Sequence, residues 1–460
     1  MTSTVLATDV SLLSGWAPTA LQAIGIVLLI PAVTRRSRRW LTVWLPVSVV
    51  VGVLVALVVR WYVEHHGTGE PLPLTMWLWV SAAGLAAAVA VLGWRGVRWW
   101  QRLVSVLAVP MALLCAALIL NQWLAYLPTV NDAWARATGA PLSGQTDRRG
   151  VAEKQREGEA PAQGTMVEVA IPDTASGFRH RKELLYLPPA WYGSNPPPKL
   201  PVVVMVDAQF GHPTDWVVAG GAQKTLDEFA GKHGGNAPVV VFVDSSGTFN
   251  NDTECVNGAR GNAADHITDD VVPYIISEFG VSPGPANWGI TGWSAGGACS
   301  VLLTVKYPQL FSAFVDIDGQ KGPFAGDKQQ TTARLFDGDA AAWADFDPRT
   351  IMGRHGRYSG VAGLFVVSEE SPTMYRDGAP QQGASLPPEP SEEVNVLDAA
   401  ATLKYMCELS SFYGIECAVT ANPGTHDFRN AGQAFAESLP WLAGRLGTPQ
   451  VPPVKMPGQP

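Results

Sequence analysis

Four long apolar stretches fill most of the first 128 residues of this 460-residue chain. Each is close to the roughly 20 residues that a helix needs to cross the hydrocarbon core of a membrane. None contains Asp, Glu, Lys or Arg within its limits, which lie near residues 15–33, 41–59, 74–94 and 103–123. A soluble fold can bury one such helix, but four in succession predict a transmembrane region of four α-helices over residues 1–128.

Charges in the short connecting loops predict the orientation of these helices. Basic residues concentrate in the first and third loops, whereas Arg60 of the second loop is balanced by Glu64 and Glu70. The basic residues are Arg35, Arg36, Arg38, Arg39, Arg95, Arg98 and Arg102. Because basic loops stay on the cytoplasmic side, the N-terminus and everything after the fourth helix are expected outside the plasma membrane. The apolar stretches lack ionisable residues, which argues against a channel or transporter and for an anchor.

The remaining chain has a different composition and divides into three parts. Residues 129–165 are rich in Gly, Ala, Pro and charged residues and predict a flexible linker, and the proline-rich residues 448–460 predict a disordered tail. Between them, residues 166–447 hold eight strand candidates, separated by helical patterns from the third onward. These candidates are 167–171, 183–187, 202–206, 239–243, 288–291, 313–317, 363–367 and 416–420. This alternation predicts an α/β domain with a mostly parallel central sheet.

A possible nucleophile follows the fifth strand candidate. Residues 292–297 read GWSAGG, a G-x-S-x-G motif between a strand and a helical pattern, which is the setting of a nucleophile elbow centred on Ser294. The chain has 46 glycines, so the motif alone also fits a glycine-rich turn that lets helix and strand pack. The catalytic interpretation therefore depends on partners elsewhere in the chain.

Candidates for those partners follow the later strands. His426 comes directly after the last strand candidate, as the general base does in hydrolases with the chain order serine, acid, histidine. The acid is expected after the preceding strand, where Glu370 is slightly favoured over Glu369. Asp316 and Asp318, one strand earlier, are the alternatives. An oxyanion hole would use the backbone amides of Ala295 and of Gln209, in the loop after the third strand.

Several sequence blocks together resemble a known family. They are LYLPPAW at 185–191, LPVVVMVD at 200–207, GWSAGG at 292–297, YPQLF at 307–311 and GTHDF at 424–428. They are similar to blocks of the esterase D and feruloyl-esterase-like α/β-hydrolases, a family related to the antigen 85 mycolyltransferases, and the resemblance spans residues 166–447. It implies an α/β-hydrolase fold with Ser294 as nucleophile, His426 as base and Glu370 or Glu369 as acid. The sequence departs from the family pattern where Asp318 and Gly319 replace the usual Ser-Gly.

Cysteine usage is consistent with an oxidising outer compartment. Cys115 lies in the fourth apolar stretch, and four cysteines remain in the α/β domain. Three pairings of these four are possible. Proximity in sequence and placement on helix and strand favour Cys255 with Cys299 and Cys407 with Cys417.

Other functional classes lack support in the sequence. The net charge is −8 and no basic run follows residue 165, so nucleic-acid binding has no electrostatic footprint. No metal-ligand spacing is present, and we expect no metal and no cofactor. We therefore expect a membrane-anchored, extracytoplasmic serine hydrolase that cleaves or transfers acyl esters, with an envelope lipid or glycolipid as substrate by analogy. The alternatives are a mycolyl- or acyltransferase with a cell-envelope sugar acceptor and a non-catalytic envelope scaffold; protein partners are not predicted.

Overall fold

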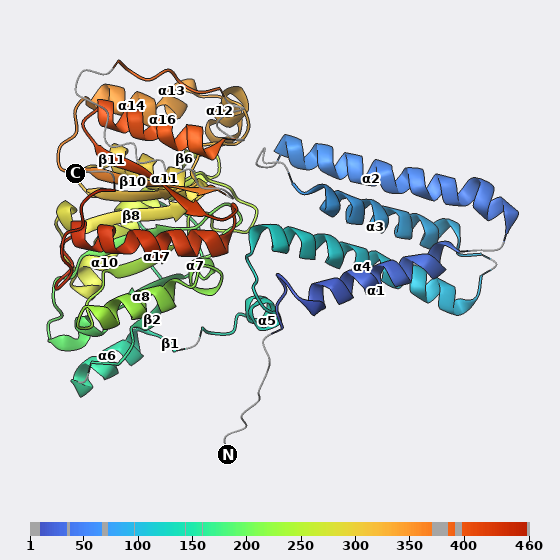
Figure 1. Ribbon diagram of the computed structural model, residues 1–460, viewed down its shortest axis with the longest axis horizontal. Coiled ribbons are helices and arrows are strands. Elements are labelled where there is room, and N and C mark those ends of the chain that lie inside the picture. Colours follow the sequence, from blue (N-terminus) through green and yellow to red (C-terminus); the bar gives the residue numbers. More distant parts are fainter. Residues whose placement is uncertain are drawn as a thin grey trace. The chain divides into compact units, whose positions relative to one another are not determined.

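The computed structural model describes residues 10–34, 37–66, 72–95, 97–142, 144–158, 160–369, 385–391 and 398–457. The chain divides into two compact units, residues 1–140 and 141–460 (Figure 1). The first unit is helical, and the second contains a large sheet with its helices.

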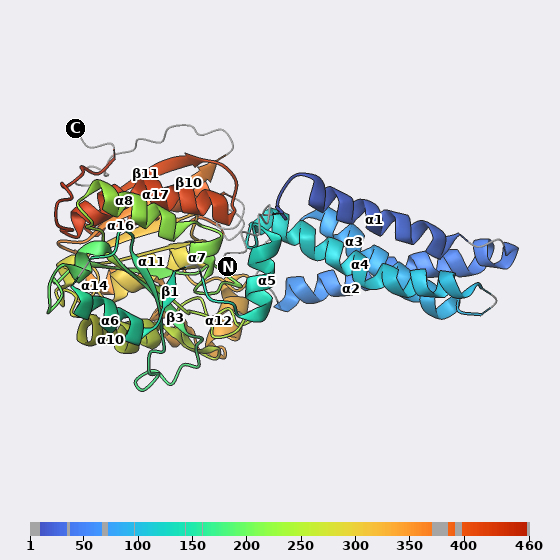
Figure 2. The same cartoon turned by 90° about the horizontal axis from the view of Figure 1, so that it is seen from below.

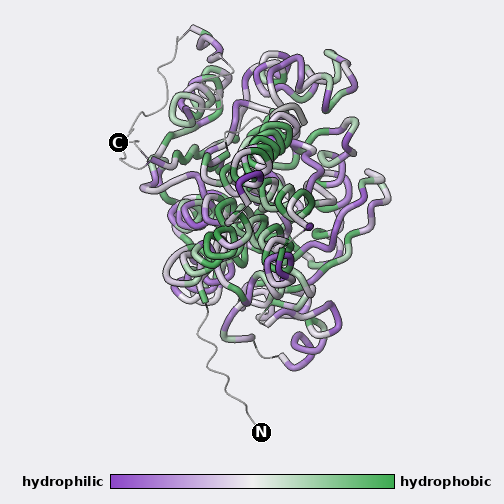
Figure 3. The backbone as a smooth tube through the Cα atoms, turned by 90° about the vertical axis from the view of Figure 1, so that its right-hand side faces the viewer, coloured by the Kyte–Doolittle hydropathy of each residue, from purple (hydrophilic) through white to green (hydrophobic). Residues whose placement is uncertain are grey.

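Four long helices make up most of the first unit. By length and composition, each is long and apolar enough to cross a membrane. They pack in the spatial order α1, α4, α3, α2 (Figure 1). Figure 2 shows the same helices from below, and their apolar residues are green in Figure 3. The helices of this unit are α1 (Trp16–Val33), the π-helical turn η1 (Trp40–Trp44), α2 (Leu45–His66), α3 (Leu74–Leu92), α4 (Trp99–Leu124) and α5 (Val130–Thr138). The four expected apolar helices are therefore present.

Two glycines allow a close contact between α2 and α3. A side chain on Gly52 of α2 would meet the carbonyl oxygen of Ser81 and the backbone nitrogen of Leu85 on α3, and Gly84 of α3 packs against Val55 in return. Paired small residues let apolar helices approach where lipid offers no hydrophobic driving force. The outward faces carry exposed apolar side chains such as Val91, which is 76% exposed. This arrangement suits helices surrounded by lipid.

Residues 129–165, expected to form a flexible linker, contain regular structure. Helix α5 begins at a capping box in which Thr129 and Asp132 bond each other's backbone. The segment also contains strand β1 (Gln145–Thr146), which pairs with the main sheet, and helix α6 (Arg148–Glu157). Val151 of α6 is buried in the core of the second unit. Helix caps and one buried apolar residue therefore give this segment regular structure, although its sequence has no hydrophobic period.

A nine-stranded sheet forms the centre of the second unit. Its spatial order is β1-β2-β3-β5-β4-β8-β9-β10-β11, and all pairs are parallel except β2 with β3 and β3 with β5. Its strands are β1, β2 (Thr165–Val169), β3 (Glu183–Leu187), β4 (Val202–Val206), β5 (Val239–Val243), β8 (Trp288–Trp293), β9 (Ala313–Ile317), β10 (Ala362–Glu369) and β11 (Glu416–Pro423). Strands β4, β5, β8 and β9 are buried at every residue, which requires cover on both faces. The expected mostly parallel sheet is confirmed.

Helices connect the parallel strands and cover the sheet (Figure 1). Helix α11 packs on β8 and β9, α16 on β10 and β11, and α17 on the central strands and against α8. The longer helices are α8 (Ala222–Lys232), α10 (Val272–Phe279), α11 (Ala295–Lys306), α12 (Lys328–Phe336), α14 (Pro348–His355), α16 (Ala399–Phe412) and α17 (Phe428–Arg445). Shorter elements are η2 (Pro189–Gly193), α7 (Asp215–Val218), β6 (Asn257–Gly258), β7 (Gly261–Asn262), α9 (Ala263–Asp265), η3 (His266–Val271), η4 (Pro285–Asn287) and α13 (Ala340–Ala344).

The proline-rich C-terminal segment, expected to be disordered, lies against the second unit as far as residue 457. Val451 and Met456 are buried, and the Val451 amide donates to the carbonyl of Thr448 over 3.1 Å. A side chain on Gly444 of α17 would meet the carbonyl oxygen of Pro452. Two apolar residues among the prolines therefore dock this part of the tail.

Candidate active site

The serine predicted as nucleophile lies on a sharp turn between β8 and α11. Ser294 has φ 56° and ψ −122°, a conformation that a residue with a side chain rarely adopts. Its amide donates to the carbonyl of Ile317 over 2.9 Å, which ties the turn to the neighbouring strand β9. A side chain on Gly292 would collide with Gly296, and one on Gly296 would come within 2.6 Å of the carbonyl oxygens of Val206 and Asp207. The glycines of the motif thus allow the sharp turn, which lies directly against the start of the loop after β4.

His426, the predicted base, lies beside this turn. It occupies the loop between β11 and α17, where Asp427 caps α17 by accepting from the amide of Asn430 over 2.9 Å. The His426 ring packs on the indole of Trp293, the residue before the serine, with ring centroids 4.7 Å apart. The histidine side chain is 32% exposed, so substrate and solvent can reach it. Two segments 132 residues apart in sequence (294 to 426) are thus brought together.

The carboxylate next to His426 belongs to Asp318 rather than to Glu369. Asp318 Oδ2 lies 3.4 Å from His426 Nδ1, and the Asp318 side chain is almost fully buried. Glu369 ends strand β10, and its backbone carbonyl accepts from the amide of Gly424 over 3.0 Å. Within the described residues, the Glu369 carboxylate makes no hydrogen bond or ion pair. Glu370 lies outside the described residues.

Strand geometry explains this difference from the sequence-based preference. Ser368 directs both its amide, at 2.6 Å, and its hydroxyl to the carboxylate of Asp318. Because successive side chains of a strand point to opposite faces, Glu369 leaves β10 on the other side. Asp318 itself has φ 52°, a tight turn after β9 that aims the carboxylate back toward β10. The sequence order alone does not show this turn.

A chain of hydrogen bonds fixes the Asp318 carboxylate. The Ser368 hydroxyl donates to Asp318 and accepts from the side-chain amide of Asn430. Asn430 is held in turn by the Asn422 amide, which donates to its side-chain oxygen over 2.7 Å. Asp316, the other alternative acid, instead accepts from the amide of Gly319 over 2.8 Å inside the sheet. Burial raises the pKa of Asp316 well above its ordinary value, and the charge of Asp318 adds to this effect.

The backbone amides of Ala295 and Gln209, predicted to form an oxyanion hole, belong to two segments that contact each other. Ala295 is the first residue of α11, where backbone amides have no acceptor within the helix. Gln209 lies in the loop after β4, and that loop contacts the turn through Asp207 and Gly296. The Gln209 side chain donates to Asp252 Oδ2 over 2.6 Å. The loop is therefore braced from a second, distant segment.

That second segment carries two neighbouring carboxyl groups that were not predicted as a pair from the sequence: Glu254 is buried, and the Asp252 side chain is 13% exposed. Burial raises the pKa of Glu254 well above its ordinary value, and neighbouring Asp252 adds to the shift. Glu254 Oε2 accepts from the amide of Phe324 over 3.1 Å, and Arg260 donates to the Asp252 carbonyl over 2.6 Å. Asp-x-Glu in a loop is too common a pattern to reveal such a pair from sequence.

Two disulfides join the cysteines that the sequence paired. Cys255 bonds Cys299 of α11, with Cα atoms 5.7 Å apart, and links the loop of Glu254 to the helix that begins beside the serine. Cys407 of α16 bonds Cys417 of β11, with Cα atoms 5.8 Å apart. Cys115, in the first unit, is a free buried thiol.

The sheet order, the strand-turn-helix at Ser294 and the histidine after the last strand together define an α/β-hydrolase fold. Residues 177–375 match the model of a family described as "Putative esterase". The match lies within the second unit of the chain.

Individual proteins that the chain resembles were also found. It is 30% identical over 294 residues to an uncharacterized protein of Corynebacterium glutamicum, covering 62% of this chain and 63% of that relative. Among solved structures, it is similar to an S-formylglutathione hydrolase from Agrobacterium tumefaciens (16% identity, TM-score 0.46, 62% of this chain and 97% of the other). It is also similar to a ferulic acid esterase (14% identity, TM-score 0.45, 62% and 99%).

Proposed function

We propose that this protein is a membrane-anchored serine hydrolase or acyltransferase that acts on acyl esters through Ser294, His426 and Asp318. The observation that carries the proposal is the strained turn at Ser294, packed through Trp293 against a histidine whose Nδ1 faces a buried carboxylate. A non-glycine residue in such a conformation costs on the order of 1–3 kcal/mol and persists only where the surroundings enforce it. A glycine-rich turn that only allowed helix and strand to pack would not require a histidine and a buried carboxylate beside it.

The chemistry follows from the positions of these groups. The Ser294 hydroxyl attacks the ester carbonyl carbon while His426 Nε2 takes its proton, and Asp318 holds the Nδ1 proton and stabilises the imidazolium. The amides of Gln209 and Ala295 would donate to the oxyanion. The tetrahedral intermediate then expels the alcohol, which receives the proton from His426, and leaves an acyl-enzyme on Ser294.

The second half-reaction decides between the two candidate activities. Water, deprotonated by His426, releases the free acid, whereas a sugar hydroxyl produces a new ester. We propose a lipid or glycolipid ester of the cell envelope as the acyl donor, since the chain carries four apolar helices that could hold the hydrolase unit at a membrane. The basic first and third loops and the two disulfides support an extracytoplasmic position for that unit.

Ester hydrolysis by the full chain in detergent tests the catalytic proposal. The wild-type protein should hydrolyse p-nitrophenyl acyl esters, and Ser294→Ala and His426→Ala should fall to the rate of buffer alone. Ser277→Ala is the matched control, because Ser277 is an exposed serine on α10 whose hydroxyl bonds only its own helix. Wild-type activity in Ser294→Ala, or equal loss in Ser277→Ala, would contradict the proposal.

A second assay separates hydrolysis from transfer. The protein is incubated with an acyl donor in the presence and absence of trehalose, and the products are resolved by mass spectrometry. An acylated sugar that depends on Ser294 would establish transfer, and release of the free acid alone would establish hydrolysis.

A further inference from the structure

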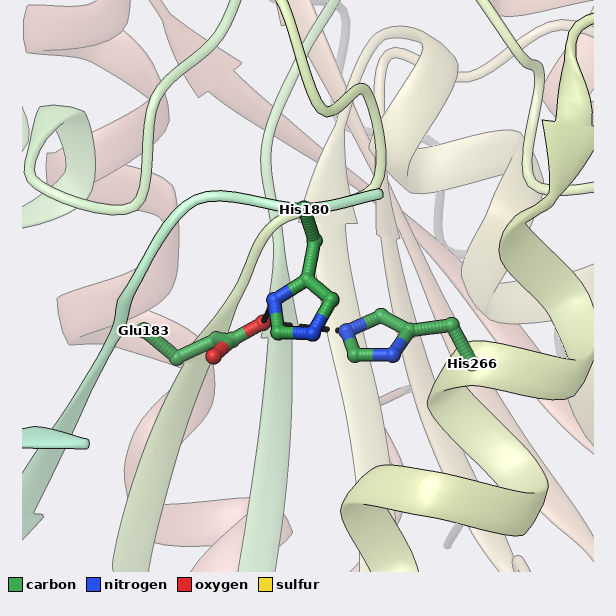
Figure 4. A group of neighbouring side chains, drawn as sticks. All are labelled: His180, Glu183 and His266. Atoms are coloured by element: carbon green, nitrogen blue, oxygen red, sulfur yellow. Dashed lines mark hydrogen bonds and ion pairs between the residues drawn. The ribbon is translucent and has the colours of Figure 1, made fainter. Parts of the chain in front are cut away.

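A compact group of two histidines and a glutamate lies at the start of β3, apart from the residues proposed for catalysis. Glu183 is the first residue of β3, His180 precedes it by three positions, and His266 begins η3 (Figure 4). The glutamate and His266 side chains are fully buried, and that of His180 is 8% exposed. One ligand-type atom from each residue lies within 4.8 Å of the other two. Nitrogen and carboxylate donors therefore converge on one point in the interior.

Both histidines turn a ring nitrogen toward the same carboxylate oxygen (Figure 4). Glu183 Oε1 lies 2.7 Å from His180 Nδ1 and 2.9 Å from His266 Nε2. The second oxygen, Glu183 Oε2, is buried and has no hydrogen-bond partner within the described part of the chain. A buried carboxylate with one oxygen shared by two rings and the other unsatisfied is costly unless a cation compensates it.

The other nitrogen of His266 is already engaged by a second carboxylate. His266 Nδ1 lies 3.4 Å from Asp270 Oδ2, and Asp270 is fixed by the amides of Ala175, at 2.9 Å, and Ser176, at 3.3 Å. When the ring is neutral and its proton sits on Nδ1, facing Asp270, the lone pair of Nε2 points toward Glu183. In that tautomer two acceptors face each other at 2.9 Å, and an added proton or a metal ion would lie between them.

A carboxylate that orients a histidine from behind is also a common feature of metal centres. Histidine ligands usually donate their second ring proton to a carboxylate or carbonyl, which fixes the tautomer that binds the metal. Asp270 has this position relative to His266. His180 Nδ1 has a second acceptor as well, the carbonyl of Arg181 at 2.8 Å, so this nitrogen also faces only electron-rich atoms.

We propose that His180, Glu183 and His266 form a structural site for a divalent transition metal ion, with Zn²⁺ as the preferred occupant. Two imidazoles and one carboxylate are donors that zinc commonly takes. Ligands at about 2.0–2.2 Å from a tetrahedral zinc are roughly 3.3 Å apart. The three side chains would therefore separate by about half an ångström when the ion binds, and the stacked rings of His180 and His266, whose centroids lie 4.0 Å apart, would tilt apart.

The location suggests what such an ion would hold in place. It would connect the loop before β3 to η3 across 83 residues of sequence, from Glu183 to His266. Arg181, between two of the ligands, pairs with Asp244 and donates to the carbonyl of Gly211 over 2.8 Å. The ion would thus fix a segment that braces the loop after β4. The site stands on its own geometry and does not depend on the proposed esterase activity.

Metal analysis of the untagged full chain in detergent tests this proposal. Wild-type protein should carry about one zinc per chain, and chelator-treated protein should bind about one Co²⁺ with the visible bands of four-coordinate cobalt. His180→Gln removes a ligand from a partly exposed loop and should weaken Co²⁺ binding by more than about 10-fold. His233→Gln is the control, because His233 contacts only its own helix end and lies outside the cluster.

Thermal unfolding gives a second readout that is independent of activity. Chelator should lower the Tm of wild type and of His233→Gln but leave that of His180→Gln unchanged. Glu183→Gln and His266→Gln should abolish the cobalt bands if they fold, and the wild-type titration decides the matter if they do not. The proposal is overturned if chelator-treated wild type binds no Co²⁺ or Zn²⁺, or if His180→Gln binds them as tightly as wild type.

Discussion

Replacement of Asp318 by asparagine removes a negative charge beside His426 while keeping the size of the side chain. In the wild-type structure Asp318 accepts from the amide and the hydroxyl of Ser368, and its Oδ2 faces His426 Nδ1. Asparagine retains an oxygen for the Ser368 amide, and its NH₂ group can donate to the Ser368 hydroxyl. The fold should therefore survive, and the effect should be confined to the histidine.

The structure gives the size of that effect. At the 3.4 Å between Nδ1 and Oδ2, an imidazolium and a carboxylate attract by about 5 kcal/mol at an effective dielectric constant of ~20. Because His426 is 32% exposed, solvent makes this an upper value, equivalent to a rate loss of about 10³- to 10⁴-fold. An amide NH₂ facing Nδ1 would also favour the tautomer protonated on Nε2, which cannot take the serine proton.

Steady-state hydrolysis of a p-nitrophenyl ester over a range of pH measures this loss. Asp318→Asn should lower kcat/KM by about three orders of magnitude or more, with unchanged far-UV circular dichroism. Glu369→Gln should remain close to wild type, since Glu369 leaves β10 on the opposite face. If Asp318→Asn keeps more than a tenth of the activity while Glu369→Gln or Glu370→Gln loses it, the assignment of Asp318 is wrong.

Two further predictions concern stability. Burial raises the pKa of Asp316 in the folded protein, so its contribution to stability is largest below the unfolded pKa of about 3.9 and is lost as pH rises through the folded value. The free energy of unfolding of Asp316→Asn should therefore rise relative to that of wild type as the pH is raised from 5 to 8, measured by denaturant midpoints. An equal difference between the two proteins at both pH values would contradict this. Removing the Cys255–Cys299 disulfide, which closes a separation of 44 residues, should cost about 4 kcal/mol, and removing Cys407–Cys417, with a separation of 10, about 3 kcal/mol. A larger loss of stability in urea unfolding on removing Cys407–Cys417 than on removing Cys255–Cys299 would show that the loop-closure entropy of the unfolded chain does not set these costs.

Strong hydrophobic periods made most of the fold predictable. Strands β3, β4, β5 and β9 have the bounds expected from their apolar runs, and the four apolar helices lie where uncharged stretches placed them. Residues 129–165, expected to form a flexible linker, and the described part of the tail expected over 448–460 contain contacts that depend on helix caps and on single buried residues such as Val151 and Met456. The composition of a segment does not show single buried residues of this kind.

Candidate residues could be predicted from the sequence where a motif fixes the backbone, but not where tertiary contacts determine which side chain lies beside the histidine. Ser294 and His426 follow from their positions after strands, but the choice of Asp318 depends on a positive φ and on the side-chain direction of Ser368. The group of His180, Glu183 and His266 is formed by segments 83 residues apart, and the sequence expectation of no metal rested on local spacing. The metal titration described above tests that expectation.

The most direct test of the central claim is the identity of the residue that reacts with a fluorophosphonate. The full chain in detergent is labelled, digested and analysed by peptide mass spectrometry, with Ser294→Ala and heat-denatured protein in parallel. We predict a single adduct on Ser294 that requires the folded protein and is lost in His426→Ala. Folded wild-type protein that stays unlabelled, or an adduct that persists in Ser294→Ala, would contradict the assignment of Ser294 as the nucleophile.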